Sequence, residues 1–499
     1  MKPRVRIAPS PTGLLHIGTV RTALFNYLFA KKNNGTFILR IEDTDKLRST
    51  KESEENILSG LKDLGIIADE CPDNPGEYGP YRQSERVHMY RPYLEQLLKE
   101  EKAYYCFCTP DELEKERNEA QKNKVAFRYS GKCKNISLED AEKRIASGEK
   151  AVIRLRVPEN REIKFQDIVR GETKQNTKDL TGDMVIAKNL DTPLYNFVVV
   201  IDDYLMKITH VIRGEDHLSN TPKQLLVYEA FGWEAPKFAH LPLILNPDKT
   251  KLSKRKNPVS IDEYLEAGYI KEAFINFLVL LGWNDGTEQE IYSLKELENL
   301  FSLERVAKAG AVFDIKRLDW VNGQYIKNMS DKELAEKTLK LLEKENIIKK
   351  IDDSSFEILK TNEEYNLKNL STWVSHEKPR ITKVKEIIDA LDFYFVDMPI
   401  YNPEIIITKK MTQEGVSTAL QKSLELLKSI EDFSQDNIKN IFIEKIQEWG
   451  MKNGEVLWPI RAALTGKERS PGAFEVSSAL GKEKTIQRIE FVIEKLKLF

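Results

Sequence analysis

A short stretch near the N-terminus, PSPTGLLHIGT at residues 9–19, decides how the fold begins. Before it, residues 5–8 alternate apolar and charged side chains and then meet the two prolines, which predicts a strand that enters a rigid turn. After it, apolar side chains recur at helical spacing and predict a helix over 16–32. A second strand is predicted at 37–41, and a second helix begins with a capping box at Ser49. This order predicts a parallel α/β sheet with a ligand site at the ends of its strands.

A second α/β block lies far downstream of the first. The apolar runs at 197–201 and 208–212 are both interpreted as strands, the first of them buried. Thr221 followed by proline predicts the start of a helix that runs to Phe231. The charged, mixed pattern between the two blocks is interpreted as an insertion into a split nucleotide-binding domain. Helical patterns dominate after about residue 325 and predict an α-helical C-terminal half.

Composition excludes several classes of protein. The chain has 499 residues, of which 41% are hydrophobic and 31% charged, which is too apolar for a disordered chain. Lys and Arg number 77 against 79 Asp and Glu, so any nucleic-acid surface must be a local patch. No apolar run approaches the roughly 18 residues of a membrane span. The N-terminus has no signal-peptide pattern, and the chain has only four cysteines. We therefore expect a cytoplasmic protein without a membrane partner.

Two elements have the chemistry of a phosphate site. His16 and Gly18 stand in the first turn of the predicted helix, where backbone N–H groups and the helix dipole attract phosphate, and a glycine leaves room for a flat purine. On these two residues alone, an ordinary strand–turn–helix is the preferred interpretation. The segment 249–256 places five positive charges in eight residues, which suits a triphosphate. The alternative is a solvated basic loop, which is what charge runs usually are.

Together, the two elements resemble a known pair of motifs. HIGT at 16–19 and KLSKR at 251–255 resemble the signatures of class I aminoacyl-tRNA synthetases. Within that class the chain is similar to the bacterial glutamyl-tRNA synthetases. The motifs that carry this likeness are PSPTG at 9–13, RIEDTD at 40–45, GPYRQS at 79–84, HVIRGED at 210–216 and LWPIRAALTG at 457–466. The resemblance covers essentially the whole chain.

The resemblance implies a fold and a reaction. The fold class is α/β, a class I synthetase Rossmann-type parallel sheet split by an insertion domain and followed by an all-α anticodon-binding half. The reaction activates L-glutamate with ATP and Mg²⁺ and transfers it to the 3′-terminal adenosine of glutamate tRNA. We expect a monomer. The expected boundaries are 1–105 and 191–255 for the halves of the catalytic domain, 106–190 for the insertion, 256–325 for a stem-contact linker domain and 326–499 for the helical region.

Glutamate carries two carboxylates, so its pocket needs cations with fork geometry. Arg6 lies in the first predicted strand and Arg213 ends a strand of the second block, where open α/β sheets bind ligands. The resemblance implies that both bind the glutamate side chain and that Glu42 holds the α-ammonium group. A charge on an edge strand is the alternative for Arg6. The implied glutamate-binding residues are Arg6, Ala8, Ser10, Glu42, Tyr195 and Arg213.

The ATP site is implied by the resemblance in the same way. His16, Gly18 and Lys254 are the implied catalytic residues, since they contact ATP phosphates or leave room for the adenine. For Asp216, helix capping is an equally good interpretation. The implied ATP-binding residues are Pro9, Pro11, Thr12, Gly13, His16, Gly18, Thr19, Lys251, Leu252, Ser253, Lys254, Arg255, Asp216 and His217.

Three cysteines indicate a metal site in the insertion. Cys106, Cys108 and Cys133 fit a zinc knuckle found in part of the family, and the resemblance implies Tyr129 as the fourth ligand. Some relatives have a histidine two residues after the last cysteine, where this chain has Asn135. A structural Zn²⁺ and three reduced thiols without a metal both stay open as interpretations.

Recognition of tRNA is expected from the insertion for the acceptor stem and from the helical half for the anticodon. Arg380 is similar in position to an arginine that glutamate-specific relatives place against the third anticodon base, which favours a discriminating enzyme. A surface arginine is the alternative for Arg380. The alternative for the enzyme is a non-discriminating form that also charges glutamine tRNA.

The sequence disfavours four other kinds of protein. A nucleotidyltransferase outside translation and a paralogue that glutamylates a modified tRNA base both lack the roughly 170 residues that follow position 325. A catalytically dead tRNA-binding protein conflicts with the intact residues Arg6, His16 and Arg213. A glutaminyl-tRNA synthetase is expected to carry C-terminal β-barrels, and strand-like alternation is scarce there.

Overall fold

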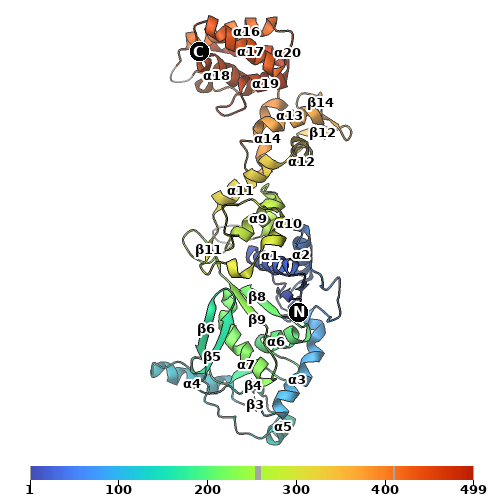
Figure 1. Cartoon of the computed structure of the whole chain (residues 1–499), viewed down its shortest axis with the longest axis vertical. Helices are drawn as coiled ribbons and strands as arrows, with labels where there is room; N and C mark the ends of the chain where they lie inside the picture. Colours follow the sequence, from blue (N-terminus) through green and yellow to red (C-terminus); the bar gives the residue numbers. More distant parts are fainter. Residues whose placement is uncertain (1, 46, 253–259, 408–410, 498–499) are drawn as a thin grey trace. The chain divides into compact units, whose positions relative to one another are not determined.

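A computed structural model describes residues 2–45, 47–252, 260–407 and 411–497. The chain forms two compact units, coloured along the sequence in Figure 1. The first unit consists of Met1–Tyr264 and Phe274–Ile315, and the second of Leu265–Ala273 and Lys316–Phe499. The finer five-part division expected from the sequence stays a prediction. No helix among the described residues has the length and apolar character that a membrane span requires.

The first unit begins with the predicted strand–helix–strand. β1 (Arg4–Ile7) and β2 (Thr36–Leu39) pair in parallel, and α1 (Ile17–Lys32) connects them. α2 (Lys51–Asp63) follows, and its N-cap is Thr50, whose hydroxyl accepts a hydrogen bond from the Ser53 backbone N–H at 3.1 Å. The cap therefore lies one residue beyond the predicted Ser49. The parallel α/β start is confirmed.

The second α/β block lies beside the first. β8 (His210–Gly214) and β9 (Lys237–Leu241) pair in parallel and are connected through α7 (Thr221–Ala230). The Thr209 backbone N–H, at the start of β8, donates to the Arg4 carbonyl oxygen at 3.0 Å and joins the two blocks. β5 (Glu162–Asp167) and β6 (Gly171–Asn176) form a hairpin that extends the sheet in the order β6-β5-β9-β8 (Figure 1). This hairpin belongs to the segment expected as an insertion, and it places Asp167 opposite Phe238 of β9.

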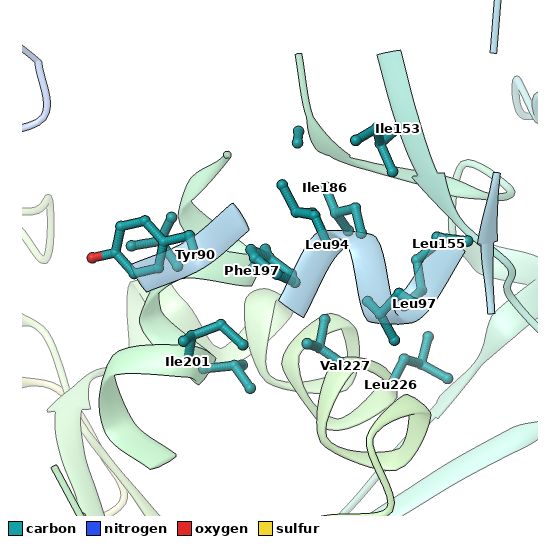
Figure 2. Packing of buried hydrophobic residues seen from close by; sticks show 14 of the residues in the cluster. Tyr90, Leu94, Leu97, Ile153, Leu155, Ile186, Phe197, Ile201, Leu226 and Val227 are labelled. Carbon is teal, nitrogen blue, oxygen red and sulfur yellow. The ribbon is translucent and has the colours of Figure 1, made fainter. Parts of the chain in front are cut away.

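One strand prediction is wrong. The apolar run 197–201 lies in the helix α6 (Tyr195–Leu205), not in a strand. Its five side chains are all buried, and Figure 2 shows Phe197 and Ile201 packed among Leu94 of α3 (Val87–Lys99) and Val227 of α7. A helix covered on every face has a continuous apolar sequence, so periodicity alone does not distinguish it from a buried strand.

The remaining elements of the first unit are short. β3 (Ala103–Cys106), β4 (Val152–Leu155) and β7 (Met184–Ala187) form an antiparallel sheet in that order. The other elements are α4 (Pro110–Lys122), α5 (Leu138–Ala146), β10 (Ile244–Leu245), α10 (Leu294–Leu300) and β11 (Ala311–Val312). Three helices carry residues of both units, namely α8 (Ile261–Glu266), α9 (Lys271–Leu280) and α11 (Ile315–Asn328). The described 3-10 turns are η1 (Gln83–Arg86), η2 (Thr177–Asp179), η3 (Glu215–Asn220), η4 (Leu303–Arg305), η5 (Val384–Glu386) and η6 (Asp392–Phe395).

The second unit is mainly helical, as predicted. Its helices are α12 (Asp331–Lys344), α13 (Leu367–Glu377), α14 (Ile387–Ala390), α15 (Pro403–Ile406), α16 (Gln413–Ser429), α17 (Gln435–Glu448), α18 (Asn453–Thr465), α19 (Ala473–Leu480) and α20 (Lys482–Leu496). A small antiparallel sheet interrupts them, formed by β12 (Ile348–Lys350), β13 (Ser355–Ile358) and β14 (Glu363–Asn366). The expectation of an all-α half is therefore corrected to a helical half with one meander. The meander forms because Phe356 and Ile358 alternate with polar residues and bury one face of β13.

Candidate active site

A cavity of about 500 Å³ opens at the carboxyl ends of β1 and β8, where an open α/β sheet is expected to bind its ligand. The predicted glutamate-binding residues all line it, namely Arg6, Ala8, Ser10, Glu42, Tyr195 and Arg213. Eight of the predicted ATP-binding residues also line it, namely Pro9, His16, Gly18, Thr19, Asp216, His217, Lys251 and Leu252. Pro11, Thr12 and Gly13 do not line it, and Ser253, Lys254 and Arg255 lie outside the described residues. The fold thus brings together segments that lie far apart in the sequence, whereas the assigned roles stay predictions.

The start of α1 is organised by its own histidine. His16 is the N-cap, and its Nδ1 atom accepts a hydrogen bond from the Gly18 backbone N–H at 3.0 Å. The neutral ring therefore carries its proton on Nε2, where it is a donor suited to a phosphate oxygen. A Cβ atom on residue 18 would lie 3.3 Å from His16 Nδ1, a tight contact that glycine avoids.

Arg6 belongs to a buried network of charges. Its Nε and Nη2 atoms each lie 3.1 Å from a carboxylate oxygen of Asp203, and Arg40 Nη1 donates to the same carboxylate at 2.8 Å. Arg40 Nη2 also donates to Glu42 at 3.2 Å. Burial raises the pKa of Glu42, and this effect outweighs the opposing charges of Arg40 and Arg6. The sequence carries no signal for Asp203, because the run 197–201 before it was interpreted as a strand, whereas Asp203 lies in the last turn of the buried helix α6.

Arg213 has a different environment from Arg6. Its Nε atom donates to His240 Nε2 at 3.2 Å, and its Nη2 atom donates to Thr221 Oγ1 at 2.8 Å. Among the described residues, its buried Nη1 atom has no hydrogen-bond partner and no carboxylate forms an ion pair with it. Burial lowers the pKa of Arg213. Arg213 is therefore a guanidinium group of the cavity wall for which no carboxylate among the described residues forms an ion pair.

The comparisons with known proteins agree with this geometry. Residues 2–320 match the family model for the class I tRNA synthetase catalytic domain (E and Q), and residues 331–493 match the anticodon binding domain. The chain belongs to the class I tRNA synthetases of the E and Q group. The family resemblance and the fold class are confirmed, and a nucleotidyltransferase outside translation is excluded.

Full-length relatives resemble the synthetase from end to end. This chain is 44% identical to glutamate–tRNA ligase 2 of Caldicellulosiruptor saccharolyticus, over 99% of both chains. It is 45% identical to the glutamate–tRNA ligase of Bacillus subtilis, over 98% of this chain and 99% of the relative. A crystal structure of a glutamate tRNA ligase from Elizabethkingia meningosepticum in complex with its amino acid superposes with a TM-score of 0.87, at 38% identity, and covers 99% of this chain and 100% of that one.

The structure adds one residue to the cavity, Arg21, and decides between the two interpretations of Asp216. Arg21 of α1 lines it but carries no signal in the sequence, because it lies on a helix face among apolar residues. It donates to the Leu281 carbonyl oxygen at 3.2 Å and to that of Pro242, and burial lowers its pKa to about 10. Asp216 caps neither η3 nor α7, and its carboxylate lies 3.6 Å from Lys251 Nζ. The structure thus places Asp216 at the cavity wall and not in a capping role.

The cysteine cluster of the insertion lies outside this cavity. The sulfur atoms of Cys106, Cys108 and Cys133 all lie within 4.8 Å of one another, and those of Cys108 and Cys133 are 3.7 Å apart. The Tyr129 hydroxyl lies 3.3 Å from Cys106 Sγ and 3.7 Å from Cys108 Sγ. The four predicted ligands therefore converge on one point.

Arg380 lies in the second unit, beside a cavity of about 720 Å³ that Glu377, Trp458 and Arg461 also line. Its Nη1 atom is 4.0 Å from the buried carboxylate of Glu377. Burial is the main reason that the pKa of Glu377 rises to about 7. The Arg380 side chain is half-exposed and lines this cavity, and its role in tRNA discrimination stays a prediction.

Proposed function

We propose that the synthetase is a glutamate–tRNA ligase that discriminates glutamate tRNA from glutamine tRNA. The observation that carries the glutamate part of this proposal is the charge pattern of the cavity, which Arg6, Arg213 and Glu42 all line. The discrimination part is supported by the similarity of Arg380 to an arginine of glutamate-specific relatives. Two guanidinium groups suit the side-chain carboxylate of glutamate, and the Glu42 carboxylate suits its α-ammonium group. The relatives named glutamate–tRNA ligase support the same substrate.

In this proposal the cavity orients glutamate for attack on ATP. Arg6 and Arg213 bind the side-chain carboxylate, with Ser10, Ala8 and Tyr195 beside it, while Glu42 holds the α-ammonium group. The α-carboxylate then attacks the α-phosphate of ATP, and the bond to pyrophosphate breaks to give glutamyl-adenylate. The terminal adenosine hydroxyl of tRNA next attacks the acyl carbon and releases AMP. No covalent enzyme intermediate is needed, since positioning and charge stabilisation supply the rate.

The ATP-binding part of the proposal uses the turn and the basic segment. The nucleotide is held at the start of α1, where helix polarity favours phosphate, by Pro9, Pro11, Thr12, Gly13, His16, Gly18 and Thr19. The segment 251–255 supplies positive charge to the leaving pyrophosphate, with Lys254 as the main contact. Mg²⁺ bound with the triphosphate neutralises part of its charge. Asp216 and His217 complete the wall of the cavity.

The remaining parts of the proposal concern tRNA and location. Residues 106–190 contact the acceptor stem, and 326–499 contact the anticodon, where Arg380 tests the third base. The halves of the catalytic domain are 1–105 and 191–255, with a linker at 256–325. The enzyme is proposed to act as a monomer in the cytoplasm.

Aminoacylation with labelled glutamate tests the proposal directly. Purified glutamate tRNA and glutamine tRNA are assayed side by side with ATP and Mg²⁺, and only the first is expected to be charged. Arg380→Ala is expected to gain charging of glutamine tRNA while its glutamate KM stays unchanged, because the residue lies in the other unit. Charging of both tRNAs by the wild type would establish a non-discriminating enzyme. Charging of neither by the folded protein would contradict the ligase.

We further propose that Cys106, Cys108, Cys133 and Tyr129 hold a structural Zn²⁺. Tetrahedral zinc with Zn–S bonds of about 2.3 Å sets neighbouring sulfur atoms roughly 3.8 Å apart, close to the 3.7 Å between Cys108 and Cys133. Cys106 is the last residue of β3 and Cys108 follows two residues later, and the Tyr129 hydroxyl accepts from the Cys133 backbone N–H at 3.2 Å. The ion would hold these segments together away from the chemistry.

Elemental analysis of the purified protein is expected to give about one zinc per chain. Cys133→Ser is expected to lose the metal and to lower the melting temperature, whereas Cys71→Ser, which changes the cysteine outside the cluster, keeps both. A metal-free wild type, prepared without chelator and supplied with zinc, would contradict the site.

A further inference from the structure

We propose that Asp167 and His240 are positioning residues that hold Arg213 in place without neutralising its charge. The proposal rests on the proposed function, in that Arg213 binds the side-chain carboxylate of the substrate. It assigns to the β5–β6 hairpin, which adds Asp167 to the sheet beside β9, a role in amino-acid recognition.

The three residues form one buried chain of hydrogen bonds. Asp167 Oδ2 lies 2.6 Å from His240 Nδ1, and His240 Nε2 lies 3.2 Å from Arg213 Nε. Asp167 and His240 are fully buried and Arg213 is 5% exposed. Thr221 Oγ1 lies 3.0 Å from His240 Nε2 and accepts from Arg213 Nη2 at 2.8 Å. Two nitrogens of the guanidinium group are thus engaged, and the buried Nη1 atom has no hydrogen-bond partner among the described residues. Arg213 also lines the cavity.

The carboxylate decides which nitrogen of the imidazole carries the proton. Asp167 also accepts from the backbone N–H groups of Val169 at 2.9 Å and Arg170 at 2.8 Å. Burial alone would raise its pKa, but the hydrogen bonds from His240 and the backbone outweigh this and lower it. The ionised carboxylate only accepts, so His240 Nδ1 must donate and Nε2 must accept. An acceptor at Nε2 is what the Arg213 N–H requires.

The hydrogen-bond chain from Asp167 through His240 also leaves the positive charge of Arg213 available. Burial lowers the pKa of His240 despite the hydrogen bond to Asp167, so the ring that contacts Arg213 is neutral near pH 7. Arg6, in contrast, is paired directly with the carboxylate of Asp203. A carboxylate placed directly on Arg213 would compete with the substrate, whereas a neutral imidazole orients the guanidinium group and leaves its positive charge for the ligand.

Asp167→Asn tests the relay with little change in shape. The new amide N–H faces His240 Nδ1 and must donate to it, so the ring proton moves to Nε2 and opposes the N–H of Arg213. The expected result is an increase of about tenfold in the glutamate KM, the effect of one hydrogen bond to a charged group, with the ATP KM unchanged. Asp183→Asn is the matched control, because that buried carboxylate accepts from Tyr104 and Val157 outside the cavity. It is expected to alter the melting temperature and not the glutamate KM.

Nitrogen-15 spectra of the histidine rings give a readout independent of activity. The chain has six histidines, and His240→Gln identifies the signal of His240. The expected spectra show the Nδ1–H form in the wild type and the Nε2–H form in Asp167→Asn. A wild-type Nε2–H form, or a tautomer change with an unaltered glutamate KM, would overturn the relay.

A separate variant distinguishes failure of the relay from failure of the binding site. If Arg213→Ala leaves the glutamate KM unchanged, Arg213 does not bind the substrate and the proposal fails at its premise. If Arg213→Ala raises the glutamate KM and Asp167→Asn does not, the binding site stands and the relay is overturned.

Discussion

Replacement of Arg213 by alanine is expected to raise the glutamate KM by a factor that corresponds to about 2–5 kcal/mol, roughly thirtyfold or more. The guanidinium group is buried at the cavity wall, and its Nη1 atom has no partner among the described residues. Without it, a substrate carboxylate enters a buried site with one fewer cation and loses a charge-assisted hydrogen bond. The effect falls on glutamate and not on ATP, so steady-state aminoacylation with each substrate varied in turn measures it.

The variant Arg213→Lys shows whether the loss reflects charge or geometry, and Arg91→Ala is the control. Arg213→Lys keeps the charge but lacks the planar fork, and we expect its glutamate KM to lie between those of the wild type and the alanine variant. Arg91→Ala removes an exposed arginine of α3 outside the cavity, and its glutamate KM should equal that of the wild type. An unchanged KM in Arg213→Ala would remove this residue from the pocket.

Replacement of Asp203 by asparagine is expected to lower the free energy of unfolding of the first unit by about 3–5 kcal/mol. The carboxylate is buried between Arg6 and Arg40, with nitrogen–oxygen distances of 3.1 and 2.8 Å. An amide carries no negative charge, so both guanidinium groups would stay buried without an ionised partner at this position. Removing one member of a buried ion network costs more stability than the intact network contributes. Denaturant titration followed by tryptophan fluorescence measures the change.

The same carboxylate predicts a dependence on pH. The charges of Arg6 and Arg40 outweigh burial and hold the pKa of Asp203 below its ordinary value of 3.8. Its contribution to stability is therefore complete above about pH 4 and is lost as the pH falls through the lower pKa of the folded state. The difference in unfolding free energy between the wild type and Asp203→Asn should shrink below pH 4. A difference that stays constant down to pH 2 would contradict the ionised network.

Asp73→Asn is the control for this prediction. Asp73 is exposed and lies 3.7 Å from Arg82, so water already solvates the pair. Its replacement should leave the denaturation midpoint close to that of the wild type.

Local sequence predicted the elements that local physics controls. The alternation before Pro9, the helical spacing after His16 and the proline after Thr221 each depend on neighbouring residues, and the structure has β1, α1 and α7 at these places. The strand prediction for 197–201 was wrong because a helix and a strand that are buried on all sides have the same continuous apolar sequence. What distinguished them was the packing of α3 and α7 around α6, a long-range property.

The candidate site also contains residues that the sequence pointed to and residues that only the structure revealed. The motifs pointed to side chains that line the cavity, including Arg6 within the first predicted strand and Arg213 at the end of a strand in the second block. The supporting residues carried no such signal. Asp203 became visible only when α6 proved to be a helix, and Asp167 only when its hairpin paired with β9.

The sequence by itself determined the family, the strand–helix–strand start and the chemical types at the cavity, because these follow from short motifs and local periodicity. The tertiary structure alone decided which charges are paired. Arg6 meets Asp203 some 200 positions away, whereas Arg213 meets a neutral imidazole. Two arginines with similar local sequence thus differ in available charge, since the partner of a buried cation is set by the distant segments that fold against it.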